Sequence, residues 1–105
     1  MILSIDEIRD KIRPICEKYN VEKVWLFGSY ARGEAREDSD VDVYAESGDH
    51  VSLLDLIAFR MDLEDAVAKD VDMITRIPSV YPIFAKYVER DKVLLYDAQS
   101  EGRTD

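Results

Sequence analysis

The residues with the clearest chemical potential in this chain are the Gly28-Ser29 pair and, after ten intervening residues, Asp40 and Asp42. The pair follows the apolar run 24–27, so we expect it at the end of a strand. A glycine there lets backbone N–H groups approach a phosphate without a Cβ in the way, and the Ser29 hydroxyl adds a donor. In a strand, side chains at i and i+2 lie on one face, so both carboxylates project together. The spacing therefore predicts a phosphate-binding turn beside a carboxylate pair that suits Mg²⁺.

A plainer interpretation of the same residues is a glycine turn followed by two solvated aspartates on an edge strand. The chain is rich in acidic residues, which makes such a pattern easier to reach by chance. Its place directly after a predicted strand favours the phosphate-binding interpretation. Arg32 also has two interpretations, because its guanidinium could reach a phosphate or could pair with Glu34 or Glu37.

The segment 70–75 offers a third carboxylate. Two-metal phosphoryl transfer usually needs more than two carboxylates, and this predicted strand carries Asp70 and Asp72. Both lie on the face opposite Val71 and Met73, so side-chain parity cannot choose between them. We prefer Asp72 because it is more central in the strand, whereas Asp70 borders the preceding helix. Clustered carboxylates are costly unless a cation offsets their charge, so a set of three favours metal binding.

Bulk composition limits the classes of protein to which the chain can belong. It has 105 residues, 47% of them hydrophobic, which suffices for one modest core. Acidic residues number 23 against 14 basic ones, and the net charge of −9 opposes nonspecific binding to nucleic acid or anionic membranes. Cys16 is the only cysteine, and no stretch resembles a signal peptide or a membrane span. We therefore expect a cytoplasmic protein that binds neither membranes nor nucleic acid directly.

The first predicted element is a helix over residues 5–19. Ser4 followed by Glu7 is a capping-box pattern, and apolar residues then recur at helical spacing. Asn20 is a natural stop. Pro14 lies inside the helix and is expected to kink it or split it into two pieces, because proline lacks the backbone N–H and clashes with the preceding turn.

The rest of the chain alternates strands with helices. Strands are predicted over 21–27, 40–45, 70–75 and 92–96, a short helix after Ser29, and longer helices over 51–67 and 81–90. The residues expected to form the apolar stripe of the long helix are Val51, Leu54, Ile57, Ala58, Met61, Leu63 and Val67. Trp25 is expected in the core. This pattern predicts an α/β (α+β) fold with a small mixed sheet of about four strands and helices packed against it. We expect one domain over 1–96 and a disordered tail over 97–105.

The residues from 27 to 34, together with 39–42, closely resemble the signature of the minimal nucleotidyltransferase (MNT) domains of the polymerase-β superfamily. The resemblance extends over 21–96, with its sharpest motifs between 27 and 43. It implies a compact α/β core with a catalytic and magnesium-binding set at Asp40, Asp42 and Asp72, and with triphosphate contacts at Gly28 and Ser29. Asp72 would also assist deprotonation of the attacking hydroxyl.

Stand-alone domains of this family and size are typically antitoxins encoded beside a HEPN-domain ribonuclease toxin. The resemblance therefore implies transfer of AMP from ATP to a tyrosine of the toxin, with two Mg²⁺ ions, in a hetero-oligomer with that partner. A second hypothesis is a binding module that neutralises its partner by occlusion without catalysis. A small-molecule acceptor is less favoured, because this short chain leaves no room for an additional helical domain to hold it.

Overall fold

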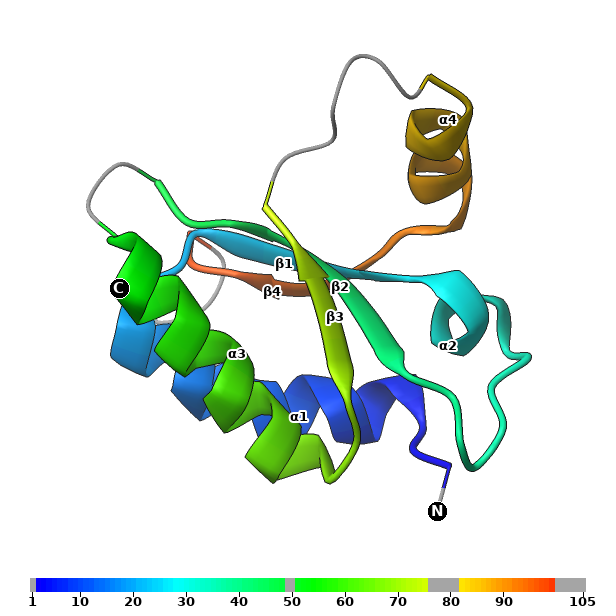
Figure 1. Cartoon of the computed structure of the whole chain (residues 1–105), viewed down its shortest axis with the longest axis horizontal. Coiled ribbons are helices and arrows are strands. Elements are labelled where there is room, and N and C mark those ends of the chain that lie inside the picture. The colour runs from blue at the N-terminus through cyan, green and yellow to red at the C-terminus, as the bar shows by residue number, and fades with distance from the viewer. Residues whose placement is uncertain (1, 49–50, 76–81, 100–105) are drawn as a thin grey trace.

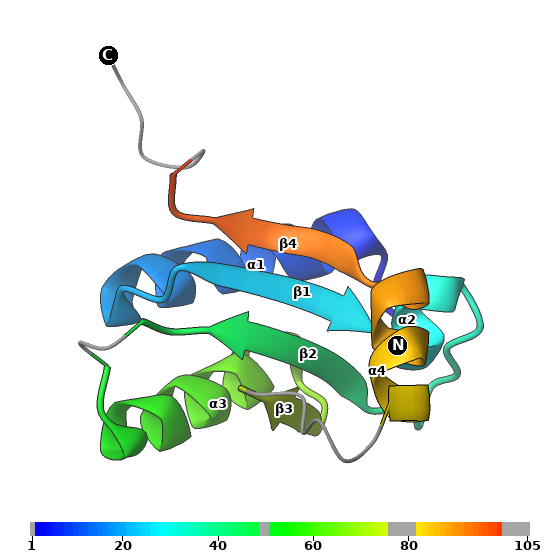
Figure 2. The same ribbon diagram turned by 90° about the horizontal axis from the view of Figure 1, so that it is seen from above.

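The computed structural model describes residues 2–48, 51–75 and 82–99, which form a mixed four-stranded sheet with helices packed against it (Figure 1). The elements in chain order are α1 (Ile5–Tyr19), β1 (Lys23–Phe27), α2 (Gly28–Arg32), β2 (Val41–Glu46), α3 (Leu53–Val67), β3 (Val71–Ile74), α4 (Pro82–Asp91) and β4 (Val93–Asp97). The strand order is β3-β2-β1-β4. α1 and α3 share one face of the sheet, and Figure 2 looks onto the other face, where α4 covers the end next to α2. The predicted fold class is confirmed.

The boundaries of α1 follow from its caps. Ser4 Oγ accepts a hydrogen bond from Glu7 N at 3.0 Å, and Glu7 Oε1 accepts one from Ser4 N at 2.8 Å. Asn20 ends the helix in the left-handed conformation at φ 57°. The helix continues through Pro14 as one element, so it is not split into two pieces, and the alternative of a kink stays a prediction. Pro14 is exposed, while buried residues on both sides of it hold the helix in place against the rest of the core; these are Ile8, Ile12 and Cys16.

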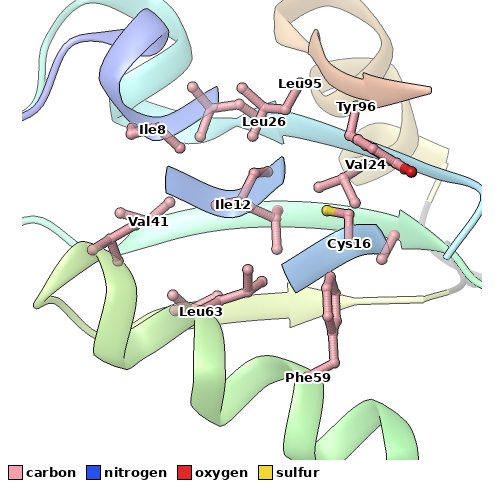
Figure 3. Packing of buried hydrophobic residues seen from close by; sticks show 14 of the residues in the cluster. Ile8, Ile12, Cys16, Val24, Leu26, Val41, Phe59, Leu63, Leu95 and Tyr96 are labelled. Carbon is pink, nitrogen blue, oxygen red and sulfur yellow. The ribbon is translucent and has the colours of Figure 1, made fainter. Parts of the chain in front are cut away.

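The sheet is built around two central strands. β1 pairs antiparallel with β2 and β4, and β2 pairs parallel with β3. A parallel pair needs a crossover connection, which α3 provides. Alternate residues of β2 are buried, beginning with Val41 and Val43, and they pack with α1 and α3 in one core (Figure 3). The labelled core residues of Figure 3 are Ile8, Ile12, Cys16, Val24, Leu26, Val41, Phe59, Leu63, Leu95 and Tyr96.

α3 buries only part of the apolar stripe that the sequence predicted: Leu63 and Val67 are buried, as expected. Phe59 and Leu63 are fully buried, whereas Leu54, Ile57 and Met61 of the predicted stripe are exposed. Apolar residues occur on both faces of this helix, so helical spacing alone does not identify the buried one. The buried face is the one that carries Phe59, the largest fully buried side chain of the described residues. Its ring packs edge-to-face on Tyr19, with ring centroids 5.7 Å apart.

β4 extends one residue beyond its predicted end. Asp97 is paired with Lys23, and Ala98 N donates to Glu22 O at 2.8 Å, so the first residues of the predicted tail join the sheet. Residues 100–105 lie outside the described residues, and the domain boundary remains a prediction. In the described part of the chain, no helix has the length and apolar character needed to cross a membrane.

Phe59→Ala tests which face of α3 stabilises the fold. We expect it to lower the free energy of unfolding by about 3–4 kcal/mol, because it removes a fully buried ring and leaves a cavity. Met61→Ala, on the exposed face of the same helix, is expected to change it by less than about 0.5 kcal/mol. Urea denaturation of both variants measures the difference. Equal losses would contradict this assignment of the two faces.

Candidate active site

The strand register brings two of the predicted carboxylates to one end of the sheet. Phe27, the last residue of β1, is paired with Asp42, and Asp42 is paired with Asp72 of β3. Because Val41 and Val43 are buried on the helix face, Asp42 projects from the opposite face. β2 lies between β1 and β3, so it is not the edge strand that the plainer interpretation assumed.

Gly28 allows the turn after β1 to touch the Asp42 carboxylate. It begins α2 with a φ of +74°, in the left-handed region that favours glycine. A Cβ at this position would overlap Asp42 Oδ2 and would lie 3.0 Å from Asp42 Cγ. Ser29 follows in the first turn of α2 and is partly buried. The predicted neighbourhood of turn and carboxylate is therefore present, while the roles of these residues remain predictions.

The structure distinguishes the two candidates for the third carboxylate. Asp40 and Asp70 precede β2 and β3, and the carbonyl of Asp70 accepts from Val41 N at 2.9 Å. Asp40 and Asp70 line the same shallow surface hollow. Asp72 instead lies directly across from Asp42 in the register. The pairing of β2 with β3 therefore favours Asp72 as the carboxylate beside Asp42, which parity in the sequence cannot decide.

Electrostatic repulsion is concentrated on Asp42. Burial, and then the negative charges of Asp72 and Asp40, raise the pKa of the Asp42 carboxyl from 3.8 to about 6, while the positive charge of Arg32 lowers it. The ionised carboxylate is therefore unfavourable in this position even with Arg32 nearby. A divalent ion would reverse the effect, because its charge favours the ionised form.

Arg32 lies at the site, but its guanidinium is engaged by two carboxylates. Its Nε donates to Glu34 Oε1 at 3.0 Å and its Nη1 to Asp91 Oδ2 at 3.2 Å. The pairing with Glu34 is one of the predicted alternatives. The side chain of Asp91, in α4, is only 9% exposed. The sequence did not predict it as a partner of Arg32, because no motif connects two residues that lie 59 positions apart. Arg90 Nε also donates to Asp91, at 2.9 Å.

The available ligands suit a hard divalent cation that arrives with its substrate. Asp40, Asp42 and Asp72 offer carboxylate oxygens, which Mg²⁺ prefers. Among the residues that the structure describes, no three His, Cys, Asp or Glu side chains make a complete metal site on their own. Mg²⁺ is commonly held by one or two carboxylates together with substrate phosphates and water. The three carboxylates therefore fit a magnesium–triphosphate complex.

A row of apolar side chains crosses the sheet next to the carboxylates and on the same face. Trp25 is paired with Leu94 on one side and Tyr44 on the other, and Tyr44 is paired with Ile74. The rings of Trp25 and Tyr44 stack with centroids 5.4 Å apart, and Lys92 Nζ lies 4.7 Å from the centroid of Trp25. The prediction of Trp25 as a core residue is wrong, because its two neighbours in β1 occupy the buried face. The alternation of buried and less buried side chains along a strand would have placed Trp25 on the face opposite Val24 and Leu26.

Comparisons with known proteins find relatives over most of the chain. The family model described as polymerase beta, nucleotidyltransferase matches residues 10–101. A protein of Methanocaldococcus jannaschii, provisionally named a protein adenylyltransferase, is 40% identical over 92 residues, covering 88% of this chain and 92% of the relative. Protein adenylyltransferase MntA of Thermococcus cleftensis is 34% identical over 96 residues, covering 88% and 96%.

Solved structures share the fold. One described provisionally as a minimal nucleotidyltransferase superposes with a TM-score of 0.70 at 28% identity, covering 87% of this chain and 95% of that chain. A toxin–antitoxin crystal structure with AMP-PNP gives a TM-score of 0.69 at 23% identity, covering 89% and 76%. A complex of tri-AMPylated Shewanella oneidensis HEPN toxin with MNT antitoxin gives 0.64 at 20% identity, covering 92% and 76%.

Gly28→Ala tests the contact between the turn and Asp42. Gly33→Ala is the matched control, because Gly33 has nearly the same φ of +75° but no atom lies within 4 Å of the place that its new methyl group would take. We expect the control to lose about 1 kcal/mol of stability from left-handed backbone strain alone. Gly28→Ala should lose at least about 1 kcal/mol more, because its methyl group must displace the carboxylate. Denaturant unfolding measures both losses, and similar values would contradict the close contact.

Asp42→Asn tests the raised pKa in metal-free protein kept in EDTA. Because the folded-state pKa of about 6 exceeds the ordinary 3.8, the folded chain binds the proton more tightly than the unfolded chain does. The stability contributed by this carboxyl is therefore complete below 3.8 and is lost as the pH rises through 6. We expect the advantage of Asp42→Asn over wild type to grow between about pH 4 and 7 by on the order of 1 kcal/mol. A pH-independent difference in the free energy of unfolding would refute the raised pKa.

Proposed function

Because this chain belongs to the polymerase β nucleotidyltransferase family, we propose that it transfers AMP from ATP to a tyrosine hydroxyl of a cognate HEPN-domain toxin and thereby neutralises it. The relatives named protein adenylyltransferases support AMP as the transferred group. The related toxin–antitoxin structures, one with AMP-PNP and one with an AMPylated HEPN toxin, support ATP and a protein acceptor. We place the reaction in the cytoplasm, where both substrates are available.

The observation that carries this proposal is the arrangement of Gly28, which directly follows β1, beside Asp42 of β2 and Asp72 of β3. The glycine turn and Asp42 are in contact, and the register places Asp72 beside Asp42. Holding these groups together leaves the Asp42 carboxylate unfavourably charged, as its raised pKa shows. Such an arrangement suits phosphoryl transfer but does not stabilise the fold. It therefore supports an enzyme rather than a module that acts by occlusion alone.

In the proposed reaction, the backbone N–H groups at Gly28 and Ser29 and the Ser29 hydroxyl hold the triphosphate. Asp40 and Asp42 provide the ligands for Mg²⁺, with Asp72 completing the set. When bound, Mg²⁺ supplies neutralisation of the triphosphate and of the charge that develops on the leaving group. Arg32, which lies close enough to lower the pKa of Asp42, contacts a phosphate after exchanging one of its carboxylate partners.

The transfer itself is an in-line displacement at the α-phosphorus. The tyrosine oxygen forms the new P–O bond, the bond from the α-phosphorus to the bridging oxygen breaks, and pyrophosphate leaves. Asp72 accepts the hydroxyl proton. Asp72 suits this role because it is exposed at the edge of the sheet, where an acceptor from another protein can reach it.

The proposal is tested by intact-mass spectrometry of the HEPN-domain protein encoded with this chain, after incubation with ATP, Mg²⁺ and the chain. We expect a mass gain of whole AMP units. Asp40→Ala/Asp42→Ala should lower the rate by about a thousandfold or more, because both ligands of the magnesium–triphosphate complex are lost.

The matched control is Asp6→Ala/Asp10→Ala, which removes the same amount of charge from exposed positions of α1. It should transfer AMP at the wild-type rate. If the double mutant lacking Asp40 and Asp42 remains active, the metal-site assignment is wrong. If wild type silences the partner without any mass gain, neutralisation occurs by occlusion instead.

A further inference from the structure

The outer face of α3 carries four large apolar side chains that no described element covers. Their exposed fractions are 73% for Leu53, 77% for Leu54, 44% for Ile57 and 55% for Met61. They make up more than half of the exposed large apolar residues found in the described chain, which are Ile2, Leu53, Leu54, Ile57, Met61, Ile83 and Leu94. Single exposed apolar side chains are ordinary, but a cluster of this kind marks an interaction surface.

Helix geometry makes these side chains one stripe. At about 100° per residue, Leu54 and Met61 lie close together on the helix circumference, opposite the buried Phe59 and Leu63. Ile57 adjoins them on the same side. The stripe runs for about two turns and lies on a helix in the outer layer of the molecule (Figure 1). It therefore offers a partner a surface of the length that one amphipathic helix contacts.

The charges around the stripe indicate the kind of partner. Asp55 and Asp65 are exposed on the same helix, and Asp65 lies one turn beyond Met61. The nearby basic groups are already paired: Lys18 with Asp62 at 3.3 Å, and Arg60 with Glu64 at 3.0 Å. The whole chain has a net charge of −9. A second copy would bring equal negative charge to this face, whereas a partner with Lys or Arg beside its apolar residues would complement it.

We propose that the outer face of α3, formed by Leu53, Leu54, Ile57 and Met61, is the docking surface for the protein that this chain modifies, and that it binds an apolar helix flanked by basic residues. This inference rests on the proposed function, because it takes the acceptor protein as the occupant. α3 contributes no residue to the site, so docking here is separate from chemistry. Because α3 covers the face of the sheet opposite Asp42, one part of the acceptor protein docks here while another part brings its tyrosine to the carboxylates.

The test uses Leu54→Gln/Met61→Gln, which removes apolar surface without changing charge, and the HEPN-domain protein encoded with this chain as the probe. Isothermal titration calorimetry should show a dissociation constant raised at least about tenfold. In the AMP-transfer assay, KM for the acceptor protein should rise while kcat at saturating acceptor stays within about twofold of wild type. Ile2→Gln, an exposed apolar residue outside α3, should match wild type in both measurements.

The two proposals fail in different ways. Asp42→Asn should bind the acceptor protein with wild-type affinity but not modify it, whereas the α3 variant should modify it at saturation but bind it weakly. Wild type that binds without transferring AMP would overturn the proposed function and leave the docking surface intact. Unchanged affinity of the α3 variant, or no binding by wild type, would overturn the docking surface. The docking surface would also be overturned if wild type sediments as a dimer and Leu54→Gln/Met61→Gln sediments as a monomer, because a second copy would then be the occupant.

Discussion

β2 lies between two strands and buries alternate side chains, so its register cannot shift by one residue without turning Asp42 into the core. The buried side chains of Val41 and Val43 therefore fix the position of the carboxylate that lies between them. That one register also determines which residues of the neighbouring strands stand beside Asp42. Core packing on one face of the sheet thus fixes the position of the Asp42 carboxylate on the other face.

Residues close together in sequence made most of the fold predictable. The capping box at Ser4 and Glu7 and the stop at Asn20 give the limits of α1, because local hydrogen bonds decide where a helix begins and ends. The glycine turn and Asp42 were predicted as neighbours for a similar reason, since β1, α2 and β2 follow one another over residues 23–46 and make a local unit. The family resemblance added the reaction, which local geometry alone does not specify.

The features that were missed depend on contacts between distant parts of the chain. Asp91 reaches Arg32 only because α4 packs beside α2, and nothing in either segment encodes that meeting. The sequence preferred Asp72 to Asp70 only for its central place in the strand, and the parallel register of β3 on β2 was needed to place it directly across from Asp42. In α3, apolar residues on both faces made periodicity ambiguous. Leu54, Ile57 and Met61 were wrongly assigned to the core, and they belong to the proposed docking surface. A helix that packs on the core with one face and binds a partner with the other has apolar residues on both faces, so its hydrophobic periodicity is weak.

β3 has only four residues and lies at the edge of the sheet, so it is held by one neighbouring strand. Edge segments of this kind open locally at a lower free energy than central strands do. Local opening of β3 would remove Asp72 from the side of Asp42 while the glycine turn, Asp40 and Asp42 kept their places on β1 and β2. Under the proposed mechanism, the chain could then still hold a nucleotide while lacking Asp72, the group proposed to take the acceptor proton. In that mechanism, substrate binding and turnover depend on parts of one small domain with different local stability.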